Sequence, residues 1–477
     1  MKALKKLIVA DKTFYKQVLI LALPIAMQSM ITIGVNMLDT IMVGRLGELE
    51  LSATSLANQF INIYHIFCMG IGMGASVLVS RYWGMKEKQP EEAMLALKKT
   101  ICIMVRITLS LALLFAVATL LMPNTLMSMY TYDTEIISRG AIYFRYSVIT
   151  YFFLGLSLVC TLVLRSVGQV RMPLYVSIGA FFVNLIANYG LIFGKLGMPR
   201  MGIAGAALGT LIARVFEASV ICGYLFFIDK KIGFRLKNLT MKTGDLLGEY
   251  VRISIPVLIS DGILAIGNNT VAMVIGRLGG NFVAANAITA VTQQMSTVLI
   301  QGVCQAGAIV TGRTLGEGNK EKAQEQGYGF LGFGLGLGLV SAFFIMAASG
   351  PIIRSYQVGE QTAHMASQLM QAISLIIVFQ ATNSIMTKGV LRGGGDTKML
   401  MLADNIFLWV LSIPLGIVAG FVLHLSPFWI YVCLKFDQIA KAVWCVLRLR
   451  SGKWIKKITT GKVSEKKGES GNEKENS

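Results

Sequence analysis

Long apolar runs alternate with short polar connections along almost the whole chain. Each run is long enough to cross a bilayer as a helix of about 20 residues, and no polar block remains that is large enough for a soluble domain. The sequence therefore predicts an all-α integral membrane protein with twelve transmembrane helices. The runs cover residues 17–43, 52–79, 94–121, 140–162, 173–194, 203–228, 250–275, 285–310, 326–348, 367–387, 399–422 and 426–447.

The two halves of the chain carry the same short motifs in the same order. The matches are Pro24 and Pro256, GRLG at 44–47 and 276–279, and VLRSVG at 163–168 with VLRGGG at 390–395. A repeat of six spans starts each copy on the same side of the membrane, which predicts parallel repeats about an axis along the membrane normal. We expect two six-helix bundles, related by pseudo-twofold symmetry, around a cleft that opens alternately to either side. Each GRLG motif predicts a glycine turn at a helix end, because glycine tolerates positive φ.

These patterns predict five segments. They are a cytoplasmic N-terminal segment at 1–16, an N-terminal bundle at 17–228, a cytoplasmic linker at 229–249, a C-terminal bundle at 250–449 and a disordered cytoplasmic tail at 450–477.

The positive charge of the chain follows its predicted topology. The net charge is +19, although only 14% of the residues are charged. Most of the lysines and arginines fall at the termini and in the even-numbered connections. Few fall in the odd-numbered connections, namely Arg45, Arg139, Lys195, Arg200, Arg277 and Arg354. This asymmetry is typical of a cytoplasmic-membrane protein with both termini in the cytoplasm, and it argues against a nucleic-acid partner.

The sequence offers little support for enzyme chemistry. The seven cysteines lie inside apolar runs, without a CxxC pair, which predicts buried free thiols. The three histidines are isolated, and the chain has no Walker, GxSxG or HExxH motif. We therefore expect neither an enzyme nor an ATP-driven pump, and no cofactor.

Several motifs resemble those of the bacterial multidrug and toxic compound extrusion (MATE) transporters. They are Pro24, NMLDTIMVGRLGE at 36–48, RYWG at 81–84, NLIANYGLIFG at 184–194 and LRGGGDTK at 391–398. The resemblance covers nearly the whole chain. It implies an antiporter, coupled to H⁺ or Na⁺, that exports amphipathic and often cationic drugs by alternating access and confers antibiotic resistance. We expect a monomer whose partners are small organic molecules and the lipid bilayer.

Asp39 is the main candidate for the coupling ion. An ionisable side chain in the bilayer interior costs about 2.5–3.5 kcal/mol, so its presence needs a reason. Asn36 lies three residues earlier, on the same helical face. The resemblance implies a proton or sodium site at this acid, with Asn184 and Asn188 beside it. One branch of the family carries aspartate at the position of Asn188, which here cannot titrate. Any metal would be Na⁺ at Asp39.

Two further positions are candidates through the resemblance. Family members often carry an acid in the seventh span, sometimes deeper than Asp261, which makes this residue a second candidate for ion coupling. Alternatively, Asp261 lies near the cytoplasmic interface and has little effect. Asn383 stands where one branch places an aspartate used for sodium, so it offers a carbonyl oxygen but no charge.

Two pairs of charged residues are spaced for contact along one helix. Asp437 and Lys441 are four residues apart, and Arg214 and Glu217 are three apart. Such pairing lowers the cost of burying charge. Our first interpretation is that both pairs only stabilise the structure. The alternative is that these four residues, together with Asn383, bind substrate or act as a switch.

Two other functions remain open. A flippase for lipid-linked oligosaccharides would need unpaired basic residues facing the cleft, and only Arg106 and Arg145 are free-standing candidates. A channel or membrane sensor would be expected to show a repeated pore signature, and none is evident.

Overall fold

The computed structural model describes residues 11–356 and 358–457, and this part of the chain is helical without a strand. The predicted all-α membrane fold is confirmed. The first half contains α2 (Lys12–Gly44), α3 (Glu48–Met85), α4 (Pro90–Leu121), α5 (Pro123–Ser128), α6 (Thr134–Ser147), α7 (Thr150–Ser166), α8 (Arg171–Phe193) and α9 (Ile203–Gly223), followed by the π turn η1 (Tyr224–Ile228) and the 3₁₀ turn η2 (Leu236–Thr240).

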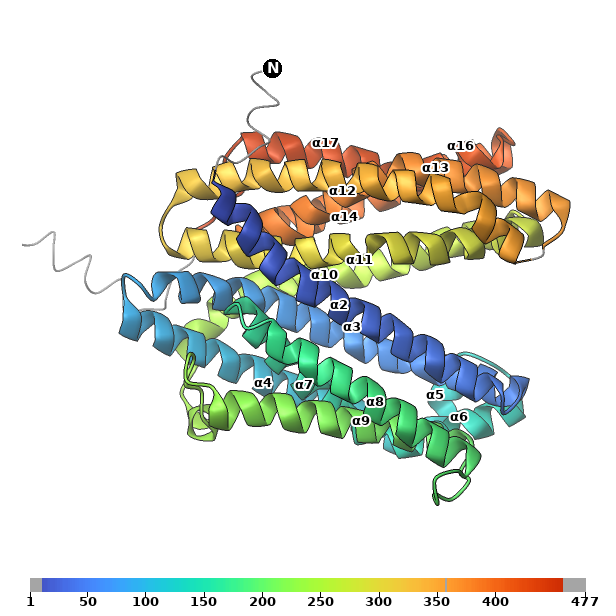
Figure 1. The fold of residues 1–477 in the computed structure, drawn as a ribbon, viewed down its shortest axis with the longest axis horizontal. Coiled ribbons are helices and arrows are strands. Elements are labelled where there is room, and N and C mark those ends of the chain that lie inside the picture. Colours follow the sequence, from blue (N-terminus) through green and yellow to red (C-terminus); the bar gives the residue numbers. More distant parts are fainter. Residues whose placement is uncertain (1–10, 357, 458–477) are drawn as a thin grey trace, which may run out of the picture. The chain divides into compact units, whose positions relative to one another are not determined.

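The second half repeats this plan with more irregular helices. It contains α10 (Gly244–Arg277), α11 (Gly280–Gly316), α12 (Lys320–Ser355), α13 (Glu360–Ser384), η3 (Ile385–Leu391), α14 (Thr397–Ile406), η4 (Phe407–Ser412), α15 (Ile413–Ile417), η5 (Val418–Val422), α16 (Pro427–Leu434) and α17 (Phe436–Arg450). η3, η4 and η5 are π-helical. Figure 1 shows α11, α12 and α13 running side by side.

The first helices of the two halves correspond in length as well as in sequence. α2 and α10 have 33 and 34 residues, and each contains its repeated proline, Pro24 or Pro256. α3 and α11 follow with 38 and 37 residues. The sequence repeat is therefore also a repeat of structure.

Within the described residues, ten helices are long and apolar enough to cross a membrane, or eleven if α6 and α7 form one bent span. These two helices meet at 57° where the sequence predicts one straight span at 140–162. The predicted span at 426–447 is divided into α16 and α17 at Lys435. On helices such as α4 and α12, large apolar side chains remain exposed, as with Leu121 and Phe343. Such exposure is appropriate to lipid, where an apolar surface costs nothing.

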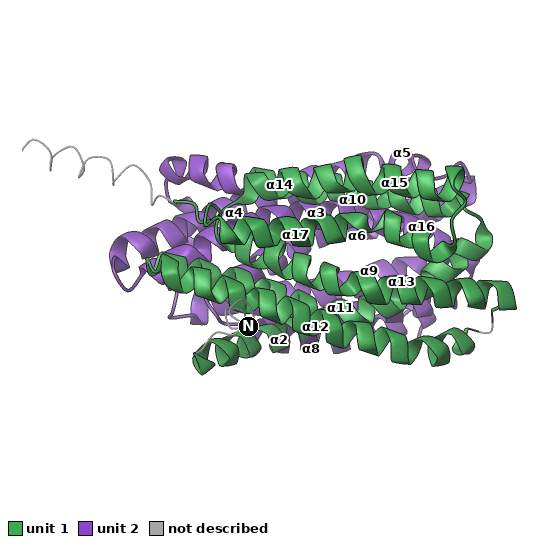
Figure 2. Cartoon of the chain, turned by 90° about the horizontal axis from the view of Figure 1, so that it is seen from above, with its two compact units in different colours: residues 1–26, 255–458 green, residues 27–254, 459–477 purple. Residues whose placement is uncertain are grey.

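The helices are grouped into two compact units (Figure 2). Among the described residues, unit 1 contains residues 11–26, 255–356 and 358–457, and unit 2 contains residues 27–254. These limits differ from the predicted bundle limits because the beginning of α2, residues 12–26, belongs to unit 1 and the beginning of α10, residues 244–254, belongs to unit 2. Phe14 of α2 packs edge-on against Phe330 of α12 in unit 1. In unit 2, Tyr250 of α10 donates a hydrogen bond to the carbonyl of Ile71 in α3.

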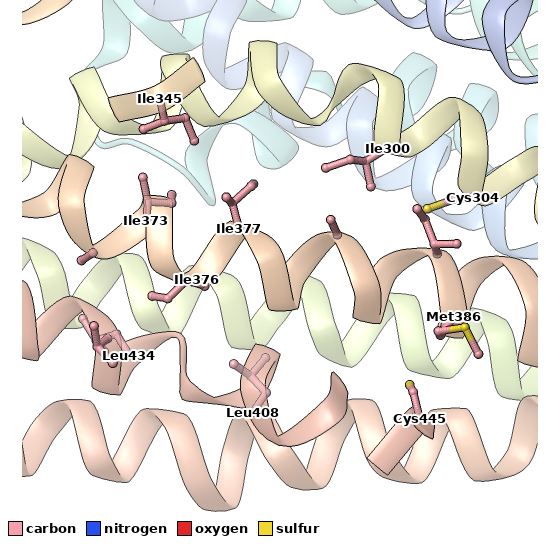
Figure 3. Packing of buried hydrophobic residues seen from close by; sticks show 14 of the residues in the cluster. Ile300, Cys304, Ile345, Ile373, Ile376, Ile377, Met386, Leu408, Leu434 and Cys445 are labelled. Atoms are coloured by element: carbon pink, nitrogen blue, oxygen red, sulfur yellow. The ribbon is translucent and has the colours of Figure 1, made fainter. Parts of the chain in front are cut away.

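Each unit has its own apolar core. In unit 1, side chains of α11, α13, η4 and α17 interdigitate around Ile373, Ile376 and Ile377, which are almost fully buried (Figure 3). In unit 2, Tyr64, Phe115 and Tyr151 form a cluster of aromatic rings between α3, α4 and α7. These cores fix the rotation of the helices that carry the polar residues described below.

The GRLG motifs form tight turns, with one difference from the expectation. Positive φ occurs at the second glycine of each motif, Gly47 (138°) and Gly279 (115°), which precedes the following helix. Gly44 ends α2. Arg45 and Leu278 lie in the resulting turns.

The C-terminal segment is packed further than the sequence suggests. The expected disordered tail begins at residue 450, but Trp454 is fully buried and donates a hydrogen bond to Gln324 of α12. Most of that predicted tail, residues 458–477, lies outside the described residues, as do residues 1–10 of the predicted N-terminal segment.

Candidate functional site

A cavity of about 600 Å³ lies within unit 2, among α2, α3, α6, α7, α8 and α9. Most of its lining is polar, which is unusual for helices of this hydropathy. Amide side chains come from Asn36, Asn58, Gln59, Asn62 and Asn188, and charged or titratable side chains from Asp39, His65, Tyr143 and Arg214. Threonine and serine hydroxyls fill much of the remainder. A polar cavity inside a membrane protein is a candidate pathway for a solute or an ion.

Asp39 is held at the cavity wall by a neighbouring helix. Its carboxylate accepts a 2.6 Å hydrogen bond from Nδ2 of Asn188, and the same nitrogen lies 3.3 Å from Oδ1 of Asn184. Asn188 is 1% exposed, whereas Asp39 is half-buried. Oδ1 of Asn188 has no hydrogen-bond partner among the described residues. The sequence-predicted residues Asp39, Asn184 and Asn188 thus lie together, with Asn36 on the same cavity wall.

Close packing of α8 against α9 fixes the position of Asn188. Gly209 of α9 lies against it, and a Cβ atom at this position would come within 2.0 Å of Asn188 Oδ1. A residue larger than glycine would therefore displace the amide that holds Asp39. The small residue on α9 and the amide on α8 act together to orient the carboxylate.

Arg214 brings a positive charge to the same cavity. Its guanidinium donates a 2.7 Å hydrogen bond to Glu217, as their spacing predicts, and it also lines the cavity with Asp39. Arg214 therefore belongs to this site as well as to a local ion pair along its helix. Asp39 can attract a cation while Arg214 can contact an anionic group, so the cavity presents both signs of charge.

The remaining predicted residues lie in unit 1, and none of them is in the lining of this cavity. Asp261 forms a 3.3 Å ion pair with Arg392. Asn383 donates a 2.9 Å hydrogen bond to Gln438. Asp437 and Lys441 are paired at 3.0 Å, as their spacing predicts.

Sequence reasoning missed several residues of these sites. Asn58, Asn62 and His65 follow at i, i+4 and i+7, so they share one face of α3, a signal that the sequence does contain. Asp404 is an isolated acid in a predicted span and could have been found by the criterion that selected Asp39. In the structure, Oδ1 of Asp404 lies 3.4 Å from Nζ of Lys441.

Arg106 has a structural role. Its guanidinium donates hydrogen bonds to the carbonyl oxygens of Leu239 (2.6 Å) and Met241 (3.0 Å), in the segment that precedes α10. One of the two basic residues considered for binding a lipid phosphate is therefore already engaged. This contact removes much of the basis for the flippase alternative.

Comparison with known proteins agrees with the repeat and the fold. The sequence model of the MatE family matches residues 24–190 and again residues 256–418. The chain is 26% identical over 458 residues to the probable multidrug resistance protein NorM of Thermotoga maritima, covering 94% of this chain and 96% of that protein. It is 23% identical over 413 residues to the multidrug resistance protein PmpM of Pseudomonas aeruginosa. This match covers 85% of this chain and 84% of that protein.

Solved structures share the fold at low sequence identity. A structure described as the outward-facing conformation of a multidrug resistance MATE family transporter of the MOP superfamily superposes with a TM-score of 0.81 at 18% identity, covering 92% of this chain and 96% of that chain. A crystal structure of MATE in complex with MaL6 superposes with a TM-score of 0.82 at 18% identity. This match covers 95% of this chain and 99% of that chain. The chain therefore belongs to the MatE family, a family of membrane transporters rather than enzymes.

Proposed function

We propose that this chain is a multidrug efflux transporter that exports small organic compounds in exchange for inward movement of H⁺ or Na⁺. Its similarity to multidrug resistance proteins supports the efflux of drugs. The proposed location is the cytoplasmic membrane, with both termini in the cytoplasm and the transporter acting as a monomer.

The observation that carries the ion coupling is the position of Asp39. A half-buried carboxylate faces a polar cavity and is oriented by Asn188, whose own carbonyl oxygen has no hydrogen-bond partner in the described part of the chain. Carboxylate, amide and hydroxyl oxygens are hard ligands that suit Na⁺, and the carboxylate can alternatively take up a proton. Substrate and ion would compete because both enter the same polar cavity.

The energetics permit such exchange. Moving one positive charge inward across a potential of about 100 mV releases about 2.3 kcal/mol. Because about 1.4 kcal/mol corresponds to a factor of ten, this supports a roughly 50-fold concentration gradient of a neutral drug. Exchange of a monovalent cationic drug for one ion moves no net charge, so the concentration gradient of the ion drives it instead. Coupling requires only that ion and drug favour opposite conformations.

The polarity of the cavity also supports a substrate with hydrogen-bonding ends. Asp39 would attract a cationic group, and the amides of Asn58 and Asn62 offer both donors and acceptors. The apolar wall is small and includes Leu51 and Leu154. An amphipathic organic cation fits this combination.

Drug transport into everted membrane vesicles tests the proposal. Proton and sodium gradients are imposed separately on vesicles with the wild-type chain, with Asp39→Asn, or with Asp245→Asn at equal expression. Asp245 is a matched control because it pairs with Lys99 outside the cavity. We expect one gradient to drive uptake, Asp39→Asn to abolish that uptake, and Asp245→Asn to retain it. Gradient-driven uptake that survives in Asp39→Asn would refute the assignment of this residue.

A further inference from the structure

Two of the seven free cysteines lie in contact within unit 2. Sγ of Cys160, in the second half of α7, is 3.4 Å from Sγ of Cys222, near the end of α9. The two residues are 62 positions apart in the sequence and belong to no CxxC motif, so no local pattern predicts this contact. The packing of α7 against α9 brings them together.

The contact is close to the geometry of a disulfide bond. Bonded sulfur atoms are about 2.05 Å apart, so these two atoms, now at 3.4 Å, need to approach each other by about 1.4 Å. Each sulfur atom moves by rotation about a single Cα–Cβ bond, and neither helix has to unfold. Because the packed helices hold the two thiols together, their reaction with each other is effectively intramolecular. The pair is therefore positioned to form a covalent bond.

The two thiols differ in their access to an oxidant. Cys160 is fully buried, whereas Cys222 is half-buried and keeps part of its surface open. A hydroperoxide therefore reacts with Cys222 first, oxidises its thiol to a sulfenic acid and is itself reduced to an alcohol. The sulfur of Cys160 then attacks the oxidised sulfur, so the S–S bond forms, the S–O bond breaks, and the thiol proton leaves with the hydroxyl group as water. Two thiols thus lose two electrons and two protons, and the hydroperoxide gains them.

The pair lies beyond one end of the cavity that contains Asp39. α7 and α9 both line that cavity, and their last lining residues are Leu154 and Arg214. Cys160 follows Leu154 by six residues, which is about 9 Å along the helix at about 1.5 Å per residue. Cys222 follows Arg214 by eight residues, which is about 12 Å. A disulfide at this point would tie two walls of the cavity together.

Hydrogen bonds already connect the ends of α7 and α9 near this pair. The hydroxyl of Tyr224, two residues after Cys222, donates a 2.9 Å hydrogen bond to Oε1 of Gln169, in the connection that follows α7. Gln169 in turn donates a 2.7 Å hydrogen bond to Asp229, which follows η1. Hydrogen bonds break and re-form during thermal motion, whereas a disulfide holds until it is reduced. Oxidation would therefore replace a reversible contact between these helix ends with a fixed one.

We propose that Cys160 and Cys222 form a redox-sensitive pair, which organic hydroperoxides convert to a disulfide that locks α7 to α9 and slows transport. In the proposed topology this end of both helices lies toward the cytoplasm, a reducing compartment, so the dithiol is the resting form and the disulfide is transient. The effect on transport rests on the proposed function. The formation of the disulfide does not.

Chemical analysis of the purified full-length protein tests the pairing without any drug. The protein in detergent is treated with cumene hydroperoxide, free thiols are alkylated, and peptides are identified by mass spectrometry without reduction. We expect a peptide that joins Cys160 to Cys222, and we expect dithiothreitol to remove it. Absence of the joined peptide from oxidised, folded protein would overturn the proposal.

Cys433→Ala is the matched control, because Cys433 is also a half-buried free thiol but lies on α16 in unit 1. This variant should form the joined peptide as the wild type does, whereas Cys160→Ala and Cys222→Ala cannot form it. In Cys160→Ala the oxidised Cys222 should persist as a sulfenic acid, which dimedone traps. A dimedone adduct on Cys160 in Cys222→Ala would contradict the order of attack.

Two further measurements test whether the bond locks the helices. Oxidation should raise the melting temperature of the wild type and of Cys433→Ala, because a disulfide restricts the unfolded chain, and leave that of Cys160→Ala unchanged. Drug transport in proteoliposomes should fall on oxidation of the wild type and of Cys433→Ala, return with dithiothreitol, and stay constant in Cys160→Ala. A joined peptide with undiminished transport would overturn the lock. A chain that transports no drug before oxidation would refute the proposed function and the effect on transport, while the joined peptide and the melting temperature still decide the pairing.

Discussion

Gly209 provides a test of the ion site that changes no ionisable or hydrogen-bonding side chain. A methyl group at this position would lie 2.0 Å from Oδ1 and 3.0 Å from Cγ of Asn188. These distances are too short for the present rotamer, so Gly209→Ala must displace the amide and break its 2.6 Å hydrogen bond to Asp39. A hydrogen bond to a charged group contributes about 1.5–3 kcal/mol.

That free energy converts directly into ion occupancy. With about 1.4 kcal/mol per factor of ten, the half-saturating ion concentration should change by about 10- to 100-fold. For a proton the change is downward, because the lost bond stabilises only the ionised carboxylate. The same substitution also crowds the backbone nitrogen of Asn188 at 3.0 Å, so an overpacking cost of about 1–3 kcal/mol in protein stability is expected.

The assay is ion-driven drug transport in proteoliposomes across a range of ion concentrations, with thermal unfolding measured in parallel. Gly223→Ala on the same helix is the matched control, because its added methyl group meets no atom within 4 Å. A double-mutant cycle with Asn188→Ala separates the two effects. In that background Gly209→Ala should leave ion dependence nearly unchanged. The reasoning is refuted if Gly209→Ala shows the same ion dependence as the control Gly223→Ala. It is also refuted if Gly209→Ala changes the ion dependence as strongly in the Asn188→Ala background as in the wild type.

Two further predictions concern packing. Trp454→Ala should lower stability by about 3–5 kcal/mol, the usual cost of truncating a buried tryptophan, whereas Trp429→Ala, at a side chain 55% exposed, should change the melting temperature little. If Trp454→Ala and the wild type melt at the same temperature, residues 451–457 do not pack against α12 as the structure shows. Arg106→Ala should increase proteolytic cleavage within residues 236–243 about ten-fold, because its bonds to two carbonyl oxygens are lost. Arg252→Ala is the control, since its side chain is 56% exposed, and unchanged cleavage in Arg106→Ala would contradict the tethering role.

Much of the candidate site around Asp39 could be found from the sequence. Asp39 is conspicuous because a charge in an apolar run is costly, and Asn184 and Asn188 stand one turn apart on one face of a helix. The proximity of these amides to Asp39 was implied only by resemblance to known transporters. The hydrogen bond from Asn188 to Asp39 confirms the proximity, and Asn184 contacts the same nitrogen of Asn188. The role of these residues in ion coupling stays a prediction.

Charged residues on different helices were harder to relate. Spacing along one helix correctly predicts the pairs Arg214–Glu217 and Asp437–Lys441. No local pattern predicts that Asp404 joins Lys441, or that Arg214 also faces the cavity of Asp39. Arg106 looked unpaired for the same reason, since its partners are backbone carbonyl oxygens more than a hundred residues away.

The sequence by itself determined the all-helical membrane fold, the approximate spans and the duplication, because these depend on the length of apolar runs and on motifs repeated in order. Only the tertiary structure decided which helix faces meet. In a soluble protein a polar stripe marks the outer face of a helix. In a membrane protein the face toward lipid is as apolar as the face toward the core, so hydropathy reveals that a helix spans the bilayer but not how it is rotated. That rotation, fixed by packing, brings Asn188 to Asp39 and Asp404 to Lys441.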